Sequence, residues 1–179
     1  MDDRELLHRI RQSDEHAFDS LFRRFYGMLV GFTESLLRGR APAEDVVQDV
    51  MLEVWRRREM LEIAESWRSY LFRATRNRAL NELRHAKVAL NAEPFVRVPE
   101  WEEPSSPAEL DAQELDREFR RVMQSLPDVE REVFEMSRRD GLKYAEIANV
   151  LDVSVKTVEA RMGRALKALR TQLADWLPG

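Results

Sequence analysis

The chain has 179 residues, of which 44% are hydrophobic and 35% charged, and its formal net charge is −4 at pH 7. The absence of cysteine excludes disulfides and thiolate-bound metals, and the three scattered histidines form no metal-binding pattern. No apolar run approaches the roughly 20 residues of a membrane span and the N-terminus has no apolar signal region, so we expect a soluble, helix-rich, cytoplasmic protein without metal or cofactor.

The first 90 residues show helical spacing of apolar side chains in four stretches. Residues 2–12 predict a short helix, and Ser13 is expected to cap a longer helix that stops at Gly39. Pro42 fits the start of a third helix, AEDVVQDVMLEVWRRR, with one apolar side. Its other side carries polar residues three and four positions apart, namely Asp45, Gln48, Asp49 and Glu53. The spacing leaves two interpretations open, a solvated helix face or a docking surface for a basic partner helix.

A loop is predicted from Glu59 to Glu65, and Ser66 is expected to cap a fourth helix that runs to Leu90. One side of this helix is apolar, and the other carries arginines and asparagines. Basic residues beside aromatic ones suit unpaired nucleic acid, because bases stack on rings while phosphates meet arginine. For Trp67 or Tyr70 taken singly, packing in the helical core is the plainer interpretation.

Residues 91–106 break the helical pattern. Prolines at positions 94, 99 and 104 and several acids leave no helical period, which is typical of a flexible, extended linker. We therefore predict a helical domain at 1–90, an acidic linker at 91–106 and a second helical domain at 107–179. Each domain carries a basic stretch that the acidic linker offsets in the total charge, and local patches decide contact with phosphate.

The second domain is predicted to begin with a helix at Pro107 that Pro127 breaks, followed by a helix that stops at Gly141. Residues 142–170 then predict a short helix, a tight turn and a longer helix capped by Ser154. The longer helix has an exposed basic and hydroxyl-bearing face. This arrangement is typical of a helix-turn-helix, whose second helix enters the DNA major groove; an ordinary antiparallel helix pair is the alternative. No strand is predicted, so the expected fold class is all-α.

Three segments carry a resemblance: AEDVVQDVMLEVWRR, SWRSYLFRATRNRALNELR and SLPDVEREVFEMSRRDGLKYAEIANVLDVSVKTVEARMGRALKALR. In this order they resemble a sigma factor of bacterial RNA polymerase, in the compact extracytoplasmic-function (ECF) branch of the sigma-70 family. The resemblance covers about residues 13–173. It implies two small helical domains, called region 2 and region 4, joined by a linker.

The resemblance also assigns roles by position. The third helix would dock on a coiled coil of the polymerase beta-prime subunit through Asp45, Gln48 and Asp49, with Glu53 one turn on. The loop and the fourth helix would recognise the minus-10 element and hold flipped bases, through Ser66, Trp67, Arg68, Arg76, Asn77 and Arg84. Region 4 would read the minus-35 element through Lys156, Thr157, Glu159, Ala160, Arg161 and Arg164. Arg138 and Lys143 would reach flanking phosphates.

Three positions depart from the family pattern. Asp152 stands where the turn often has glycine, and aspartate tolerates the left-handed conformation better than most residues. Glu159 stands where the family often has a basic residue, so it would either accept a hydrogen bond from cytosine or weaken non-specific binding. Gly163 replaces a larger residue; it lowers helix propensity by roughly 1 kcal/mol relative to alanine and would permit close approach of DNA.

The sequence thus predicts a promoter-specificity subunit that is neither an enzyme nor inserted in a membrane. Its expected partners are core RNA polymerase, through the beta-prime clamp coiled coil and the beta flap, promoter DNA and an anti-sigma factor. The linker acids Glu100, Glu102 and Glu103 would mimic nucleic acid in a basic polymerase channel. Two alternatives remain open. A one-component helix-turn-helix regulator predicts duplex binding without polymerase, and a helical adaptor for proteins predicts no salt-dependent DNA affinity.

Overall fold

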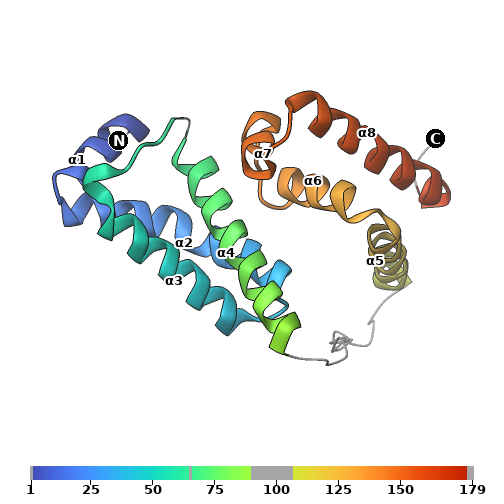
Figure 1. Cartoon of the computed structure of the whole chain (residues 1–179). Helices are drawn as coiled ribbons and strands as arrows, with labels where there is room; N and C mark the ends of the chain where they lie inside the picture. The colour runs from blue at the N-terminus through green and yellow to red at the C-terminus, as the bar shows by residue number, and fades with distance from the viewer. Residues whose placement is uncertain (1, 65, 90–106, 177–179) are drawn as a thin grey trace. The chain divides into compact units, whose positions relative to one another are not determined.

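A computed structural model of the chain describes residues 2–64, 66–89 and 107–176; of residues 87–89, 107–113 and 175 it describes the backbone alone. Every regular element in these ranges is helical, which confirms the predicted all-α class (Figure 1). The elements are α1 (Asp3–Arg11), α2 (Glu15–Leu37), α3 (Arg40–Arg56), the 3-10 turn η1 (Arg58–Met60), α4 (Trp67–Ala89), α5 (Pro107–Ser125), α6 (Asp128–Arg138), α7 (Tyr144–Leu151), α8 (Val155–Gln172) and the 3-10 turn η2 (Ala174–Trp176). The predicted linker at 91–106 lies outside the described residues.

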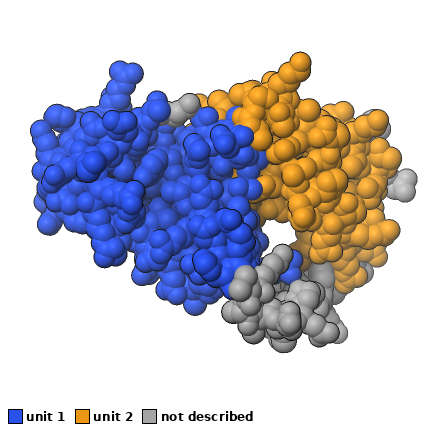
Figure 2. All heavy atoms as spheres, in the orientation of Figure 1, with its two compact units in different colours: residues 1–92, 148–152 blue, residues 93–147, 153–179 orange. Residues whose placement is uncertain are grey.

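The chain forms two compact units, residues 1–92 with 148–152 and residues 93–147 with 153–179 (Figure 2). Residues 148–152 end α7 and form the turn into α8, so structurally they belong to the helix pair of the second unit. Each unit buries its own set of apolar side chains.

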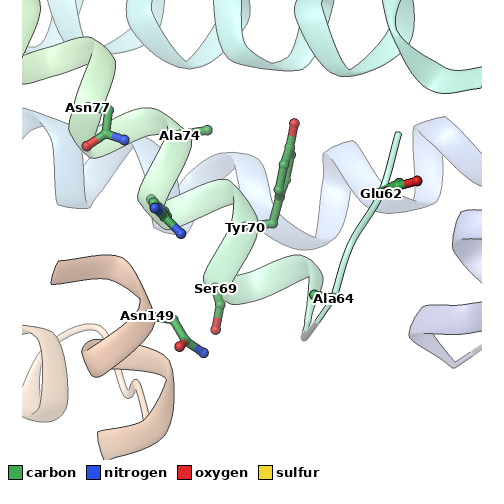
Figure 3. Close-up of a pocket in the computed structure, with 8 residues that line it drawn as sticks. Glu62, Ala64, Ser69, Tyr70, Ala74, Asn77 and Asn149 are labelled. Carbon is green, nitrogen blue, oxygen red and sulfur yellow. The ribbon is translucent and has the colours of Figure 1, made fainter. Parts of the chain in front are cut away.

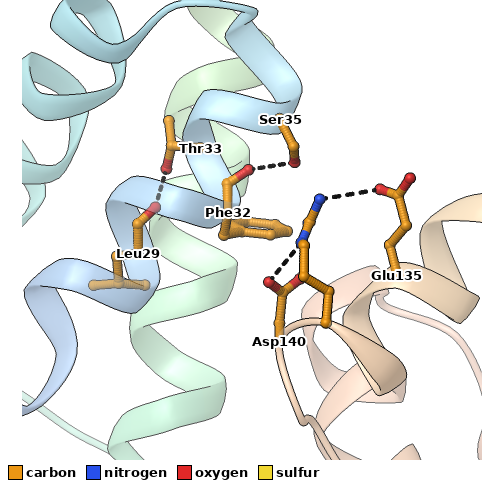
Figure 4. A network of polar contacts seen from close by, with 7 residues as sticks. Leu29, Phe32, Thr33, Ser35, Glu135 and Asp140 are labelled. Atoms are coloured by element: carbon orange, nitrogen blue, oxygen red, sulfur yellow. Dashed lines mark hydrogen bonds and ion pairs between the residues drawn. The ribbon is translucent and has the colours of Figure 1, made fainter. Parts of the chain in front are cut away.

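The first unit is built on α2, α3 and α4, which pack against one another, with α1 against α2 (Figure 1). Its largest fully buried side chains include Trp67, Phe32 and Phe72, and the rings of Phe32 and Phe72 lie 5.0 Å apart at a tilt of 52°. The buried Thr33 hydroxyl donates to the Leu29 carbonyl at 2.7 Å (Figure 4). A hydroxyl within the core therefore has its hydrogen bond.

The start of α2 differs from the sequence prediction. Asp14, not Ser13, is the N-cap, and its Oδ1 accepts from the backbone N–H groups of His16 and Ala17 at 3.0 and 3.1 Å. Ser13 instead takes a left-handed φ of 63° in the turn from α1. The Arg9 guanidinium donates to Asp14 at 2.7 Å, and this hydrogen bond holds the pKa of the carboxyl below its usual range. A carboxylate with an arginine beside it is the stronger acceptor, which is why the cap lies one residue later.

The end of α2 also differs from the prediction. Arg38 is the left-handed C-cap, with a φ of 55°, although Gly39 follows it. Gly39 has extended backbone and precedes α3, which begins two residues before Pro42. The proline thus lies inside the first turn of α3, where its missing N–H leaves no hydrogen bond unmade.

In the second unit, α6 and α5 both pack against α8. The buried core includes Val122 and Leu126 of α5 and Leu169 of α8. As predicted, Gly141 lies at the helix stop, with a φ of 66°. After α6, the Arg139 guanidinium donates to Asp140 at 3.0 Å and to Glu135 at 3.5 Å (Figure 4), while burial raises the pKa of Glu135.

Candidate nucleic-acid and partner-binding surfaces

The turn between α7 and α8 has the geometry of a helix-turn-helix. Asp152 adopts a φ of 54°, so the left-handed position predicted from the sequence is confirmed. Ser154 is the N-cap of α8, as predicted: its Oγ accepts the backbone N–H of Thr157 at 3.1 Å. The hydroxyls of the same two residues lie 2.8 Å apart. The cap therefore fixes both the start of α8 and the position of the Thr157 side chain.

The two faces of α8 divide as the periodicity predicts. Val158, Met162 and Ala165 are buried on the inner side. Six residues of α8 were predicted to contact DNA. Of these, Lys156, Glu159, Ala160 and Arg164 are exposed, and Thr157 and Arg161 are half-buried. Val155, expected on the inner stripe, is the first residue of α8 and is 41% exposed. An exposed basic helix face with a fixed N-terminus is the form that enters a major groove.

Arg164 has a contact that the sequence did not reveal. Its Nε donates to Oε1 of Glu130 on α6 at 2.6 Å, and Glu130 is only 8% exposed. A charged hydrogen bond to a nearly buried carboxylate is stronger than a surface ion pair. Arg164 thus ties α8 to α6 while much of its side chain stays in solvent. Glu130 was not predicted, because the acids on α6 are alike in sequence and differ only in burial.

The outer face of α3 is acidic and solvent-accessible. Asp45, Gln48 and Asp49 are exposed, and Glu53 is half-buried. Among them Leu52 is 44% exposed, whereas the valines of the opposite side are buried. Acids around an exposed leucine suit a basic, amphipathic partner, because both charge and apolar area can be matched.

Two residues of this acidic face contact other helices of the first unit. Asp49 pairs with Arg78 of α4. The Gln48 amide lies 3.5 Å from the Tyr26 hydroxyl of α2. The acidic face of α3 and the basic side of α4 therefore share an ion pair, which no spacing in the sequence predicted.

The start of α4 corrects one predicted DNA contact. Trp67 is 0% exposed, so its side chain presents no surface to DNA and is a core residue. Its indole N–H donates to the Asp3 carbonyl at 3.2 Å. Ser66 caps α4 as predicted, since its Oγ accepts the Ser69 backbone N–H at 3.1 Å. A tryptophan can serve either role, and here burial rather than stacking on a base decides it.

A hollow lies beside the N-terminal part of α4, and we call it the α4 hollow. The residues of α4 and of the segment before it that line the hollow are Glu62, Ala64, Ser69, Tyr70, Arg73, Ala74 and Asn77. Figure 3 shows Ser69, Tyr70, Ala74 and Asn77 on the helix and Glu62 and Ala64 on the preceding segment. Tyr70 is half-buried, and burial raises its pKa. A hollow lined by an aromatic ring, an amide and a guanidinium group has the chemistry to stack and hydrogen-bond a base.

The predicted minus-10 residues are only partly gathered at this hollow. Asn77 lines it, whereas Arg68 and Arg76 are half-buried and outside its lining. Arg84 is exposed, and its guanidinium donates to Asn81 one turn earlier. Glu62 lies in the loop that the resemblance assigned to the flipped bases, whereas Ser69 and Tyr70 were not among the predicted minus-10 residues. The alternation of exposed and buried positions on α4 could have indicated Tyr70, but the position of the loop could not be derived from periodicity.

Among the described residues, no helix is long and apolar enough to cross a membrane. No group of three or more His, Asp or Glu residues in the described ranges is placed to hold a metal ion.

Comparison with protein families gives two matches. The family described as Sigma-70 region 2 matches residues 21–88, and the family described as Sigma-70, region 4 matches residues 116–169. The first match covers α3 and all but the last residue of α4, and the second covers α7, the turn and most of α8. The segments that carried the resemblance in the sequence are thus those that the family comparison finds.

Individual proteins agree with the family matches. The ECF RNA polymerase sigma factor SigK of Mycolicibacterium vanbaalenii is 31% identical over 169 residues, which span 92% of this chain and 86% of that protein. SigK of Mycobacterium tuberculosis is 28% identical over 172 residues, 94% of this chain and 91% of that protein.

Solved structures share the fold. CnrH in complex with the cytosolic domain of CnrY has a TM-score of 0.68 at 26% identity, covering 97% of both chains. The sigma factor RpoE in complex with the anti-sigma factor NepR from Bartonella quintana has a TM-score of 0.61 at 21% identity and covers 88% of this chain and 96% of that one. The second likeness is one of fold alone.

Proposed function

The chain belongs to the ECF branch of the sigma-70 family of RNA polymerase sigma factors, and from this membership we propose how its surfaces divide the work of promoter recognition. It is an alternative RNA polymerase sigma factor. Members of this family are initiation factors without catalytic activity, and we infer the same of this chain. The matches to both sigma regions favour this function over a one-component regulator.

The acidic face of α3 is the proposed docking surface for core polymerase. Asp45, Gln48 and Asp49 are exposed, and Leu52 adds apolar area among them. A coiled coil with basic side chains would match both properties. Electrostatic complementarity of this kind mainly raises the association rate of the two partners and fixes how they align. It adds less to their affinity.

The α4 hollow is the proposed site for a base of the minus-10 element. Opening a duplex costs a few kcal/mol per unstacked base, and stacking on an aromatic side chain returns about 1–3 kcal/mol. Tyr70 supplies such a ring, and Asn77 and Arg73 supply donors in the lining of the same hollow. Arg68, Arg76 and Arg84 remain proposed contacts to the backbone of the open strand.

The face of α8 is the proposed reader of the minus-35 element. Lys156 and Arg161 carry positive charge for phosphates and guanines, and Glu159 can accept from a cytosine amino group. Ala160 is exposed and suits contact with a thymine methyl. Arg138 and Lys143, both exposed on the second unit, remain proposed phosphate contacts.

We also propose that an anti-sigma factor regulates this chain in the cytoplasm, where RNA polymerase is found. RpoE of Bartonella quintana has been solved with the anti-sigma factor NepR, and CnrH with the cytosolic domain of CnrY. The α3 face and the α4 hollow are the surfaces whose occlusion would stop initiation.

One observation carries the proposal: a single chain joins an exposed acidic helix face to a capped helix-turn-helix, within matches to both sigma regions. The test is run-off transcription from a pool of promoter fragments with core polymerase, with and without the chain. We expect sequence-selective transcripts only when both are present. Selective duplex binding by the chain alone, with no stimulation of core polymerase, would instead establish the one-component regulator.

A matched pair of variants tests the docking surface. Asp45→Lys reverses a charge on the exposed face of α3 and should weaken binding to core polymerase by about tenfold or more, because like charges at an interface are costly. Asp19→Lys makes the same change on the exposed side of α2, at an acid whose ion pair with Arg23 is a surface contact of little energy. If the two variants weakened binding to core polymerase equally, α3 would not be the docking helix.

A further inference from the structure

The segment between η1 and α4 is held at both ends by α1. At its start, the Leu61 carbonyl accepts from the Arg11 guanidinium, from Nε at 3.0 Å and also from Nη2. At its end, the Trp67 backbone N–H donates to Oδ2 of Asp3 at 3.0 Å, and the indole N–H donates to the Asp3 carbonyl at 3.2 Å. Figure 1 shows the segment beside α1, running in the opposite direction. The residues between these anchors include Glu62 and Ala64, which line the α4 hollow.

The helix that makes these contacts is itself firmly placed. Leu6 and Ile10 are 3% and 0% exposed, so α1 is packed into the core of the first unit. Asp2 caps the helix by accepting the Glu5 backbone N–H at 2.8 Å. The Arg24 guanidinium of α2 donates to the other Asp3 oxygen at 3.3 Å, which orients the carboxylate.

The length of α1 therefore sets the distance between the two anchors. Asp3 and Arg11 are its first and last residues, and a helix rises about 1.5 Å per residue, which separates them by about 12 Å along the axis. A helix of fixed length cannot stretch or shorten as a loop can. The ends of the segment are thus held at a nearly constant spacing, whatever enters the hollow.

None of this follows from the family match to region 2, which begins at residue 21, after α1 has ended. We propose that Asp3 and Arg11 are positioning residues for minus-10 recognition, which act through Leu61 and Trp67 to hold Glu62 and Ala64 in register with Tyr70 and Asn77. This inference rests on the function proposed above. Neither residue needs to touch DNA. Their effect is on how strongly the hollow prefers one base over the others.

The role differs measurably from general stabilisation. If Arg11 and Asp3 only held the fold together, their loss would lower activity on every promoter in the same proportion. If they position the segment, their loss should reduce the preference among bases at the flipped position and leave docking on core polymerase and minus-35 dependence unchanged. Preorganised geometry of this kind is what gives a recognition site its selectivity.

The experiment uses the full chain with core polymerase and compares transcription from promoters that differ only at the flipped minus-10 base. Arg11→Ala and Asp3→Ala should each reduce the ratio between preferred and non-preferred base by roughly fivefold, the scale of one lost hydrogen bond. Arg11→Lys, which keeps one donor, should recover part of the ratio. The matched controls are Arg4→Ala and Glu5→Ala, which remove the same charges from exposed positions of α1. Both controls should keep the wild-type ratio.

A second measurement follows the chain without polymerase. Hydrogen exchange of the backbone amides at 62–64 should quicken in Arg11→Ala, while amides in the middle of α2 and α3 keep their protection. A wild-type base ratio in Arg11→Ala and Asp3→Ala, or a uniform loss of activity with the ratio intact, would overturn the role of α1. Absence of promoter-dependent transcripts with the wild-type chain would overturn the proposed function itself, and this role with it.

Discussion

Arg164 of the recognition helix α8 donates to Glu130 of α6 at 2.6 Å, and Glu130 is 8% exposed. One arginine thus has a proposed DNA contact and a structural contact at the same time. The structural contact constrains any experiment on the DNA contact, because removal of Arg164 also removes the donor of a nearly buried carboxylate.

Arg164→Ala is expected to destabilise the second unit by about 1–3 kcal/mol, since it leaves the Glu130 carboxylate without this partner. Chemical denaturation of the full chain, followed by circular dichroism, measures the loss. Arg170→Ala, an exposed arginine in the last turn of the same helix, is the control and should change stability by less than about 0.5 kcal/mol. In a Glu130→Gln background, Arg164→Ala should lower the free energy of unfolding by much less. An undiminished cost in that background would assign the effect to something other than this pair.

Gly163→Ala should stabilise α8 by about 1 kcal/mol, because a Cβ built at this exposed position meets nothing within 4 Å and alanine favours the helix. If glycine is there for close approach of DNA, the same change should weaken transcription that depends on the minus-35 element. Gly27→Ala is the matched control: its Cβ also meets nothing, but it lies on α2. Stabilisation by both variants with unchanged minus-35 dependence would leave Gly163 without a role in DNA binding.

The turn of the helix-turn-helix gives a third prediction. Asp152 has a φ of 54°, a conformation that costs most residues about 1 kcal/mol and glycine nothing. Asp152→Ala should therefore lower the midpoint of thermal unfolding, and Asp152→Gly should preserve or raise it. A lower midpoint in both variants would show that the Asp152 side chain, not its backbone conformation, stabilises the turn.

Acid stability tests the cap of α2. The hydrogen bond from Arg9, with those from the backbone of Ala17 and His16, lowers the pKa of Asp14 from its ordinary value of 3.8. A carboxyl with a depressed pKa contributes stability that is fully present above that ordinary value and is lost as the pH falls through the lower value of the folded state. Asp14→Asn keeps an oxygen for the cap but cannot titrate, so its stability should fall less steeply with acid than that of the wild type.

The measurement is the thermal midpoint across a series of buffers between about pH 2 and pH 5. Asp19→Asn, a carboxylate further along α2, controls for the removal of one negative charge. The same slope in Asp14→Asn as in the wild type would show that the Arg9 and Asp14 pair does not persist in solution.

Periodicity was sufficient to predict the helices and their inner faces. The stripe of α8 with Val158 and Met162, the Ser154 cap and the left-handed Asp152 are all local features, set by residues within one or two turns of each other. Local rules were less reliable for choosing between adjacent N-cap candidates such as Ser13 and Asp14. The choice depends on a contact with a residue outside the turn, which only one of the two makes. Arg9 supplies that contact.

The candidate site was predictable only where it depends on a helix face. The acids of α3 and the basic residues of α8 lie where their spacing put them. Trp67 and Tyr70 show the limit, because the spacing gives both rings to the inner side of α4 and only packing separates the buried one from the one at the hollow. The anchors from α1 contact residues 50 and 64 positions further along the chain, and no short-range pattern predicts such contacts.

The ion pair between Asp49 on α3 and Arg78 on α4 links the proposed polymerase-docking face to the basic side of α4. Without this pair the two surfaces could evolve independently. A substitution that adapts the acidic face to a diverging polymerase also changes the charge beside the arginines of α4, and a change at Arg78 alters the face offered to polymerase. Across related sigma factors, the two positions should therefore change together more often than exposed residues on different helices usually do. In a genetic screen, a compensating change at one of them should rescue a charge reversal at the other.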